Sequence, residues 1–93
     1  MMDGTKKRGK LEVIRDMLAI IRAHGNSIKP TPLLRLSNLS SEIFGKYFSE
    51  LLEKYFVKEI KSDGETLITL TDKGFKYLEN YKVITLFIEE FGL

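Results

Sequence analysis

An Asp-Gly pair between two apolar stretches is the feature that most narrows the folds open to this chain. Asp63 and Gly64 lie between residues 56–60 and 66–70, which are rich in β-branched and apolar side chains. Asp-Gly is among the strongest short-range signals for a tight turn between antiparallel strands. The sequence therefore predicts a two-stranded β-hairpin, and the segments on both sides of it have the spacing of helices instead.

Two helices are predicted early in the chain. Over residues 10–24, apolar side chains recur at spacings of three and four, which predicts a core-facing helix that ends at Gly25, with Asn26 continuing the turn. We expect Thr31 to cap a short second helix and Pro32 to be its first residue. The apolar positions available for burial are Leu11, Val13, Ile14, Met17, Leu18, Ile20 and Ile21 in the first helix, and Leu33, Leu34 and Leu36 in the second.

A third helix follows after a short turn. Asn38 tolerates the left-handed conformation of a tight turn, Leu39 is expected to point inward, and Ser40 is a good N-cap for a helix that runs to about Lys54. Two helices joined in this way, the second longer than the first, form a helix-turn-helix. The face that should pack on the first two helices carries Phe44, Phe48, Leu51, Leu52 and Tyr55.

A final helix is predicted from Thr71 or Asp72 onward, accepting the local cost of Gly74. One of its faces has the alternating four- and three-residue spacing of a coiled-coil seam, and the neighbouring faces are apolar as well. Because such a helix needs burial on more than one side, we expect it to pair with a second copy of the chain. The alternative is that it folds back and buries both faces within its own chain. The predicted dimerisation residues are Tyr77, Tyr81, Ile84, Ile88 and Phe91, with Val83, Leu86 and Phe87 on neighbouring faces.

The order of three helices, a β-hairpin and a terminal helix predicts a winged helix, in which the hairpin is the wing. The fold class is then α+β and mainly helical, a winged helix-turn-helix with a C-terminal dimerisation helix. We divide the chain into a flexible basic arm at residues 1–9, a DNA-binding domain at 10–71 and the dimerisation helix at 72–93. A length of 93 residues with 43% hydrophobic content fits one such domain.

Four stretches of the sequence also resemble a known family. "KKRGKLEVIRDMLAII", "NLSSEIFGKY", "LLEKYFVKE" and "LTDKGFKYLENY" are similar to corresponding stretches of the small archaeal winged-helix proteins that include the ten-kilodalton "a" class of Sulfolobus DNA-binding chromatin proteins. The resemblance covers about residues 6–81, includes a glycine at position 45, and implies duplex-DNA binding by a homodimer whose terminal helices pair as an antiparallel coiled coil. The chain ends soon after Tyr81, earlier than the family's long terminal rod, so the resemblance does not fix the spacing between the two DNA-binding units.

The third helix has little charge with which to read DNA. Opposite its core face, glutamates outnumber lysines, and Lys46 is the one side chain of a kind that usually recognises purine edges. Glu42 with Lys46, and Glu50 with Lys54, are spaced for stabilising ion pairs along the helix. Gly45 permits close approach of a neighbouring helix, a strand or a DNA backbone.

DNA affinity is therefore expected from the surroundings of this helix. The net charge is +2, and its positive excess lies at the front of the chain. Cations in the arm, the second helix and the wing can each neutralise a phosphate, and the start of the third helix offers free backbone N–H groups. The predicted DNA-binding residues are Lys6, Lys7, Arg8, Lys10, Arg35, Ser40, Ser41, Gly45, Lys46, Lys58 and Lys61.

These features predict a homodimer that binds double-stranded DNA with low to modest sequence specificity, in a chromatin-like or accessory transcriptional role, in the cytoplasm and associated with the nucleoid. The alternatives are a sequence-specific repressor and a winged-helix module that binds proteins instead of DNA. The chain has no cysteine and one histidine, which argues against disulfides, metal centres and thiol or triad chemistry. We expect no enzymatic activity, cofactor, small-molecule substrate or membrane span.

Overall fold

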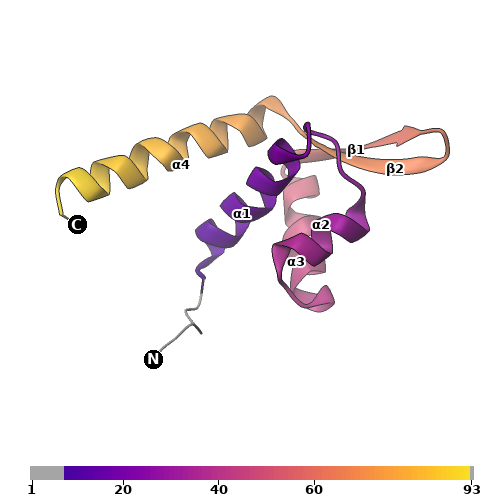
Figure 1. Cartoon of the computed structure of the whole chain (residues 1–93), viewed down its shortest axis with the longest axis horizontal. Coiled ribbons are helices and arrows are strands. Elements are labelled where there is room, and N and C mark those ends of the chain that lie inside the picture. The colour runs from indigo at the N-terminus through magenta and orange to yellow at the C-terminus, as the bar shows by residue number, and fades with distance from the viewer. Residues whose placement is uncertain (1–7, 93) are drawn as a thin grey trace.

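The computed structural model describes residues 8–92, in which four helices and a β-hairpin follow in the predicted order (Figure 1). They are α1 (Lys10–Ala23), α2 (Pro30–Ser37), α3 (Ser41–Glu53), β1 (Val57–Ser62), β2 (Glu65–Leu70) and α4 (Asp72–Glu90). The first three helices pack together, the hairpin projects from one side of them, and α4 crosses α1 and continues past the other side. The predicted fold class, a mainly helical α+β winged helix-turn-helix, is confirmed.

The core is built around one face of α1. Met17, Leu18 and Ile21 are fully buried there, between side chains of α2, α3 and β2. The prediction for Leu11 is wrong, because this side chain is 64% exposed. Leu11 lies in the first turn of α1, where it lines an open groove beside α4 instead of the core.

The start of α2 differs from the prediction. Its N-cap is Lys29, which makes no side-chain cap, and Pro30 is the first helical residue in place of Pro32. The cause is Ile28, whose N–H and carbonyl both bond to the backbone of Ile68 in β2, at 3.1 and 2.7 Å. The chain leaves this bridge directly into the helix, and proline fits the first position because its missing donor has no helical partner there. Leu36, predicted to be available for burial, is 48% exposed.

The turn between α2 and α3 agrees with the prediction. Asn38 has the left-handed conformation, with φ 59° and ψ 41°, and the Ser40 hydroxyl accepts a hydrogen bond from the Ile43 N–H at 3.2 Å. Leu39 is half-buried against the core, as expected. The helix-turn-helix is therefore set by the residues that the sequence indicated.

Tyr55 was wrongly predicted to continue the buried face of α3. The helix ends at Glu53, and Tyr55 takes a left-handed conformation with its side chain 73% exposed. The next residue, Phe56, folds back so that its N–H bonds to the carbonyl of Leu51 at 2.9 Å, while the Tyr55 N–H bonds to Leu52. This pattern is a Schellman helix ending, and it satisfies the last carbonyls of α3 before the wing begins.

The wing is an antiparallel hairpin whose paired residues run from Val57 with Leu70 to Ser62 with Glu65. Asp63 and Gly64 form its two-residue turn, both with positive φ, as expected for a type I′ turn. Each strand begins one residue away from the predicted position. The base of the wing is buried and its tip is exposed.

α4 is capped by Thr71, whose hydroxyl accepts a hydrogen bond from the Gly74 N–H at 3.2 Å. A Cβ at Gly74 would collide with the Phe56 carbonyl oxygen and come within 3.3 Å of the Leu70 side chain. The glycine is therefore required for close packing of α4 on the end of α3 and the wing. The first half of the helix packs on α1, with Leu78 buried, and the second half extends past the body (Figure 1).

Candidate nucleic-acid interface

The exposed face of α3 is the surface that a helix-turn-helix presents to DNA. It consists of Glu42, Lys46, Ser49 and Glu53, and Ile43 and Gly45 lie at its two edges. The space beside Gly45 is open, since no atom of residues 8–92 other than its own helix backbone and chain neighbours lies within 4 Å of an added Cβ. No helix or strand in this part of the chain uses the approach that Gly45 permits, so it faces outward.

Glu50 is neutralised by two lysines. Its Oε2 atom lies 2.8 Å from Lys10 Nζ and 2.9 Å from Lys54 Nζ, which ties the start of α1 to α3. The hydrogen bond from Lys10, followed by that from Lys54, lowers the pKa of the Glu50 carboxyl to about 2. Lys10 was predicted to contact DNA, and its ammonium group here compensates a glutamate of the third helix.

Arg8 is also engaged within the protein. Its guanidinium donates to Asp16 Oδ2 at 2.7 Å and to the Ser37 carbonyl at 3.0 Å. These bonds join the segment before α1 to the end of α2, and Asp16 receives a second bond from Arg15. The charge of Arg8 therefore serves the packing of the helix-turn-helix. The predicted contacts Lys6 and Lys7 lie outside the described residues.

Three of the predicted cations have neither an ion pair nor a side-chain hydrogen bond within residues 8–92, whereas Lys61 bonds to the Thr66 hydroxyl. Between residues 8 and 92, Arg35 on α2, Lys46 on α3 and Lys58 on β1 form no ion pair, and all three are exposed. The expected pair between Glu42 and Lys46 is not formed in this part of the chain. The structure thus leaves one free cation on each of three elements, α2, α3 and the wing.

The two wing lysines point in opposite directions. Side chains alternate along a strand, so Lys58 and Lys61 lie on opposite faces of the ribbon. Lys61 Nζ donates to the Thr66 hydroxyl across the hairpin at 2.6 Å. One flat surface cannot contact both side chains, although a groove that encloses the wing can.

The sequence placed Asn26 in the turn after the first helix, but its contact with the base of the wing was not predicted. Asn26 has φ 59°, and its Oδ1 accepts a hydrogen bond from the Leu70 N–H at 2.7 Å. It follows Gly25, which also has a positive φ, so the two residues turn the chain from α1 toward β2. The tolerance of asparagine for this conformation was a usable signal. The identity of its partner, Leu70, could not be predicted, because the two residues are far apart along the chain.

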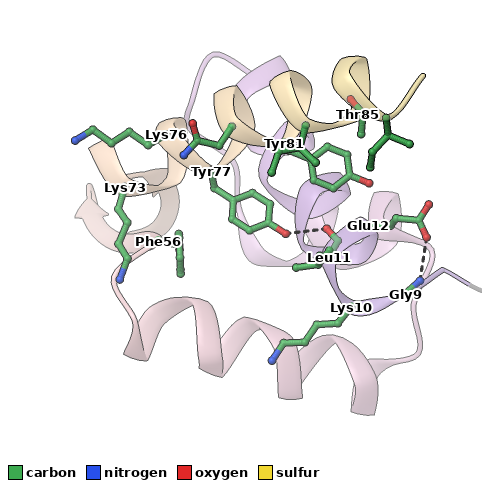
Figure 2. A pocket seen from close by; sticks show the side chains of 13 residues that line it. Gly9, Lys10, Leu11, Glu12, Phe56, Lys73, Lys76, Tyr77, Tyr81 and Thr85 are labelled. Atoms are coloured by element: carbon green, nitrogen blue, oxygen red, sulfur yellow. Dashed lines mark hydrogen bonds between the residues drawn. The ribbon is translucent and has the colours of Figure 1, made fainter. Parts of the chain in front are cut away.

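An apolar groove of about 680 Å³ runs between the start of α1 and one side of α4 (Figure 2). Tyr77 crosses it. Its hydroxyl donates to the Leu11 carbonyl at 2.9 Å, and its ring packs nearly perpendicular to that of Phe56, with the ring centroids 5.7 Å apart. Burial raises the pKa of Tyr77. Four of the five predicted dimerisation residues line this groove: Tyr77, Tyr81, Ile84 and Ile88. The fifth, Phe91, lies beyond it and is exposed.

The second half of α4 carries most of the apolar surface that the fold leaves uncovered. Of eleven large hydrophobic side chains that are exposed in the described chain, six belong to this segment or to the residue that caps it. They are Val83, Ile84, Leu86, Phe87, Ile88 and Phe91. The alternative that α4 folds back and buries both faces therefore does not occur in this part of the protein.

Residues 8–92 contain no helix with the length and apolar character needed to cross a membrane. The same residues contain no group of three or more metal-binding side chains.

No curated protein matches this sequence significantly. Among the solved structures that share its fold are two winged-helix or DNA-binding proteins. A winged-helix DNA-binding protein from STIV is 15% identical, with 85% of this chain and 91% of that chain covered and a TM-score of 0.70. Sso10a-2, a DNA-binding protein from Sulfolobus solfataricus, is 17% identical, with 90% and 85% covered and a TM-score of 0.72.

A family profile described as winged helix-turn-helix matches residues 7–89, which is nearly the whole chain. That range includes the three-helix core, the wing and almost all of α4. The chain therefore belongs to the winged helix-turn-helix family.

Proposed function

We propose that this protein binds duplex DNA as a homodimer with low to modest sequence specificity, in a chromatin-like or accessory transcriptional role. The observation that carries the proposal is the combination of free cations on α2, α3 and the wing with an α3 that contains no Arg, Asn or Gln. The two structural relatives are both described as DNA-binding proteins.

The charge distribution supports backbone binding over base reading. Arg35, Lys46 and Lys58 can each neutralise a phosphate, and phosphate contacts position a protein without reading sequence. Hydrogen-bonded readout of purines uses Arg, Lys, Asn or Gln, and the exposed face of α3 offers only Lys46. Glu50 does not oppose phosphate strongly, since Lys10 and Lys54 compensate it.

The uncovered half of α4 supports the homodimer. A helix exposed on several apolar sides requires a partner, and pairing of two α4 helices would cover Ile84, Ile88 and Phe91 and close the groove beside Leu11. Because α4 is continuous from Gly74 to this surface, such a dimer carries two helix-turn-helix units. The second unit doubles the set of phosphate contacts.

The test is a salt titration of binding to several unrelated duplexes, with the full chain and fluorescence anisotropy. We expect log Kd to rise steeply and linearly with log salt concentration, with little difference between sequences. Salt-insensitive binding would contradict the proposal. A marked preference for one site would favour a sequence-specific repressor, and no binding at low salt would favour the protein-interaction module.

Lys46→Ala gives the sharpest version of this test. We expect weaker binding to every duplex by a similar factor, and a slope reduced by about one for each Lys46 that contacts a phosphate. Lys82→Ala is the matched control, because it removes the same charge from α4 on a side that faces neither α3 nor the wing. If log Kd has the same dependence on log salt concentration for both variants, Lys46 does not contact phosphate and α3 is not part of the interface.

A further inference from the structure

One apolar side chain lies on the surface assigned to DNA. Ile43 is in the first turn of α3 and is 46% exposed. In a helix-turn-helix, the N-terminal residues of the second helix are those that reach the edges of the bases. An isoleucine cannot neutralise a phosphate or donate a hydrogen bond to a purine, so any role at the DNA must rest on apolar contact.

The capped first turn of α3 and the β-branching of Ile43 restrict the conformations of its side chain. Its N–H donates to the Ser40 hydroxyl at 3.2 Å, so the N-cap holds the first turn of the helix. A β-branched side chain in a helix has one strongly preferred χ1 rotamer. Ile43 therefore presents a rigid apolar surface, and little conformational entropy is lost when something packs on it.

The rest of the exposed face of α3 allows close approach of a duplex. Lys46 is three residues further along α3 and therefore lies on an adjoining side of the helix. At Gly45, on the other edge of this face, no side chain of residues 8–92 outside its chain neighbours lies within 4 Å of an added Cβ. The helix can thus approach the base edges closely, with an ammonium group and an apolar side chain at the contact.

We propose that Ile43 reads the C5-methyl groups of thymine in the major groove. Among the groups that base pairs expose there, this methyl is the apolar one, and apolar side chains contact it in protein–DNA interfaces. The inference rests on the proposed DNA binding and adds the chemical group that is recognised. It gives the protein a modest preference for A·T-containing sequence, about fourfold in affinity for each methyl group buried.

Replacing thymidine with deoxyuridine tests this directly, because the two differ only in that methyl group. Alternating d(A-T) and d(A-U) duplexes of equal length keep every hydrogen-bonding group, and fluorescence anisotropy at one fixed salt concentration gives both Kd values. The full chain should bind the thymine duplex about fourfold more tightly per contacted methyl. Ile43→Ala should bind both duplexes equally, with the affinity of the unmodified protein for the uracil duplex.

Two further variants separate recognition from structure. Ile43→Val keeps a β-branched side chain and should retain most of the preference for thymine. Leu36→Ala removes a leucine of nearly equal exposure, 48%, from the neighbouring helix α2, and should leave the ratio of the two Kd values unchanged. Circular dichroism shows whether each variant is folded.

Each remaining outcome has a defined meaning. Equal affinity of the full chain for the two duplexes overturns the assignment and leaves DNA binding in place, as does an Ile43→Ala protein that still prefers thymine. Loss of affinity for both duplexes by the same factor gives Ile43 a merely supporting role and also overturns it. Failure of the full chain to bind either duplex at low salt refutes the proposed DNA binding itself, and the inference with it.

Discussion

At the scale of single residues, the two glycines inside helices have opposite roles. Gly74 lies against the Phe56 carbonyl and the Leu70 side chain. α4 can pack against the base of the wing only because this residue has no Cβ. Gly45 is in open space, with no contact in the described chain that needs it. Helix propensity disfavours both equally, so the sequence alone gave them the same local cost.

Alanine substitutions should therefore change stability in opposite directions. Gly74→Ala is expected to lower the free energy of unfolding by about 1–3 kcal/mol, because the new methyl group meets backbone. Gly45→Ala should raise it by up to about 1 kcal/mol through helix propensity. Urea unfolding of the two variants measures this, and each is the control for the other. A stabilising Gly74→Ala would show that α4 can move away from Phe56 at little cost.

Glu50 makes stability depend on pH. Its pKa in the folded protein is about 2, below the ordinary value of 4.5, so its pairing with Lys10 and Lys54 contributes fully above pH 4.5 and is lost as the pH falls toward 2. Glu50→Gln should lower the urea midpoint modestly at pH 7 and have a much smaller effect near pH 2, where the carboxyl is protonated in the unfolded state and partly protonated in the folded state. Glu53→Gln is the control, since Glu53 forms no ion pair within residues 8–92. A pH-independent difference for Glu50→Gln would contradict the assignment.

At the scale of elements, the wing is attached to the helices through few polar contacts. Asn26 Oδ1 holds the Leu70 N–H, and the Thr71 hydroxyl donates to the Tyr55 carbonyl at 2.5 Å while it caps α4. Lys73 Nζ donates to the Lys54 carbonyl at 2.8 Å, at the end of α3. The position of the wing relative to α3 thus depends on side chains from the α1–α2 loop, the N-cap of α4 and the first turn of α4.

Asn26→Ala tests the contribution of the first of these contacts. It removes the acceptor for the part-buried Leu70 N–H and places alanine at a positive φ, so the free energy of unfolding should fall by about 2–4 kcal/mol. Asn26→Asp keeps an acceptor and tolerance for this conformation, and should lose much less. Guanidinium unfolding measures both. Equal losses would mean that the hydrogen bond contributes little.

Sequence patterns predicted elements well where the cause was local. The turn at Asn38, the cap at Ser40 and the Asp63–Gly64 turn all depend on their own residues and were confirmed. The wrong start of α2 depends on a distant partner, because Pro30 begins the helix where Ile28 pairs with β2. The wrong prediction for Tyr55 has a local cause, since Tyr55 and Phe56 bond back to Leu52 and Leu51 at the end of α3.

The same distinction applies to the candidate site. Its location on the helix-turn-helix and wing followed from local patterns. The sequence could not show which cations are free. Arg8 bonds to Asp16 and Ser37, and Lys10 pairs with Glu50 from α3. The spacing of a charged residue along the chain shows that it can be exposed, and does not show which distant carboxylate it meets.

At the scale of the whole molecule, the chain is elongated because α4 leaves the body. The described part of the protein measures 49 Å along its longest axis and 22 Å along its shortest. The apolar second half of α4 lies at one end of the molecule, and the wing lies at the other (Figure 1). A partner on α4 would therefore leave the wing and the exposed face of α3 open.

The dimer can be tested by one charged substitution. The chain has a mass of 10.7 kDa, and light scattering of the unmodified protein should give twice that mass. Ile84→Asp should give the monomer mass without unfolding, because Ile84 is exposed in the single chain. Lys82→Asp adds the same side chain on another side of α4 and should remain dimeric. An unmodified protein that stays at 10.7 kDa at micromolar concentration would contradict the homodimer.

The unbroken course of α4 has a geometric consequence for such a dimer. The same helix packs against the body at Gly74 and Leu78 and carries the exposed apolar side chains that begin at Val83, so its length fixes the distance between the body and this apolar surface. Each residue of helix adds 1.5 Å and turns the next side chain by about 100°. In such a dimer, the number of residues between Leu78 and the apolar surface would set both the distance between the two α3 helices and their relative rotation at the DNA.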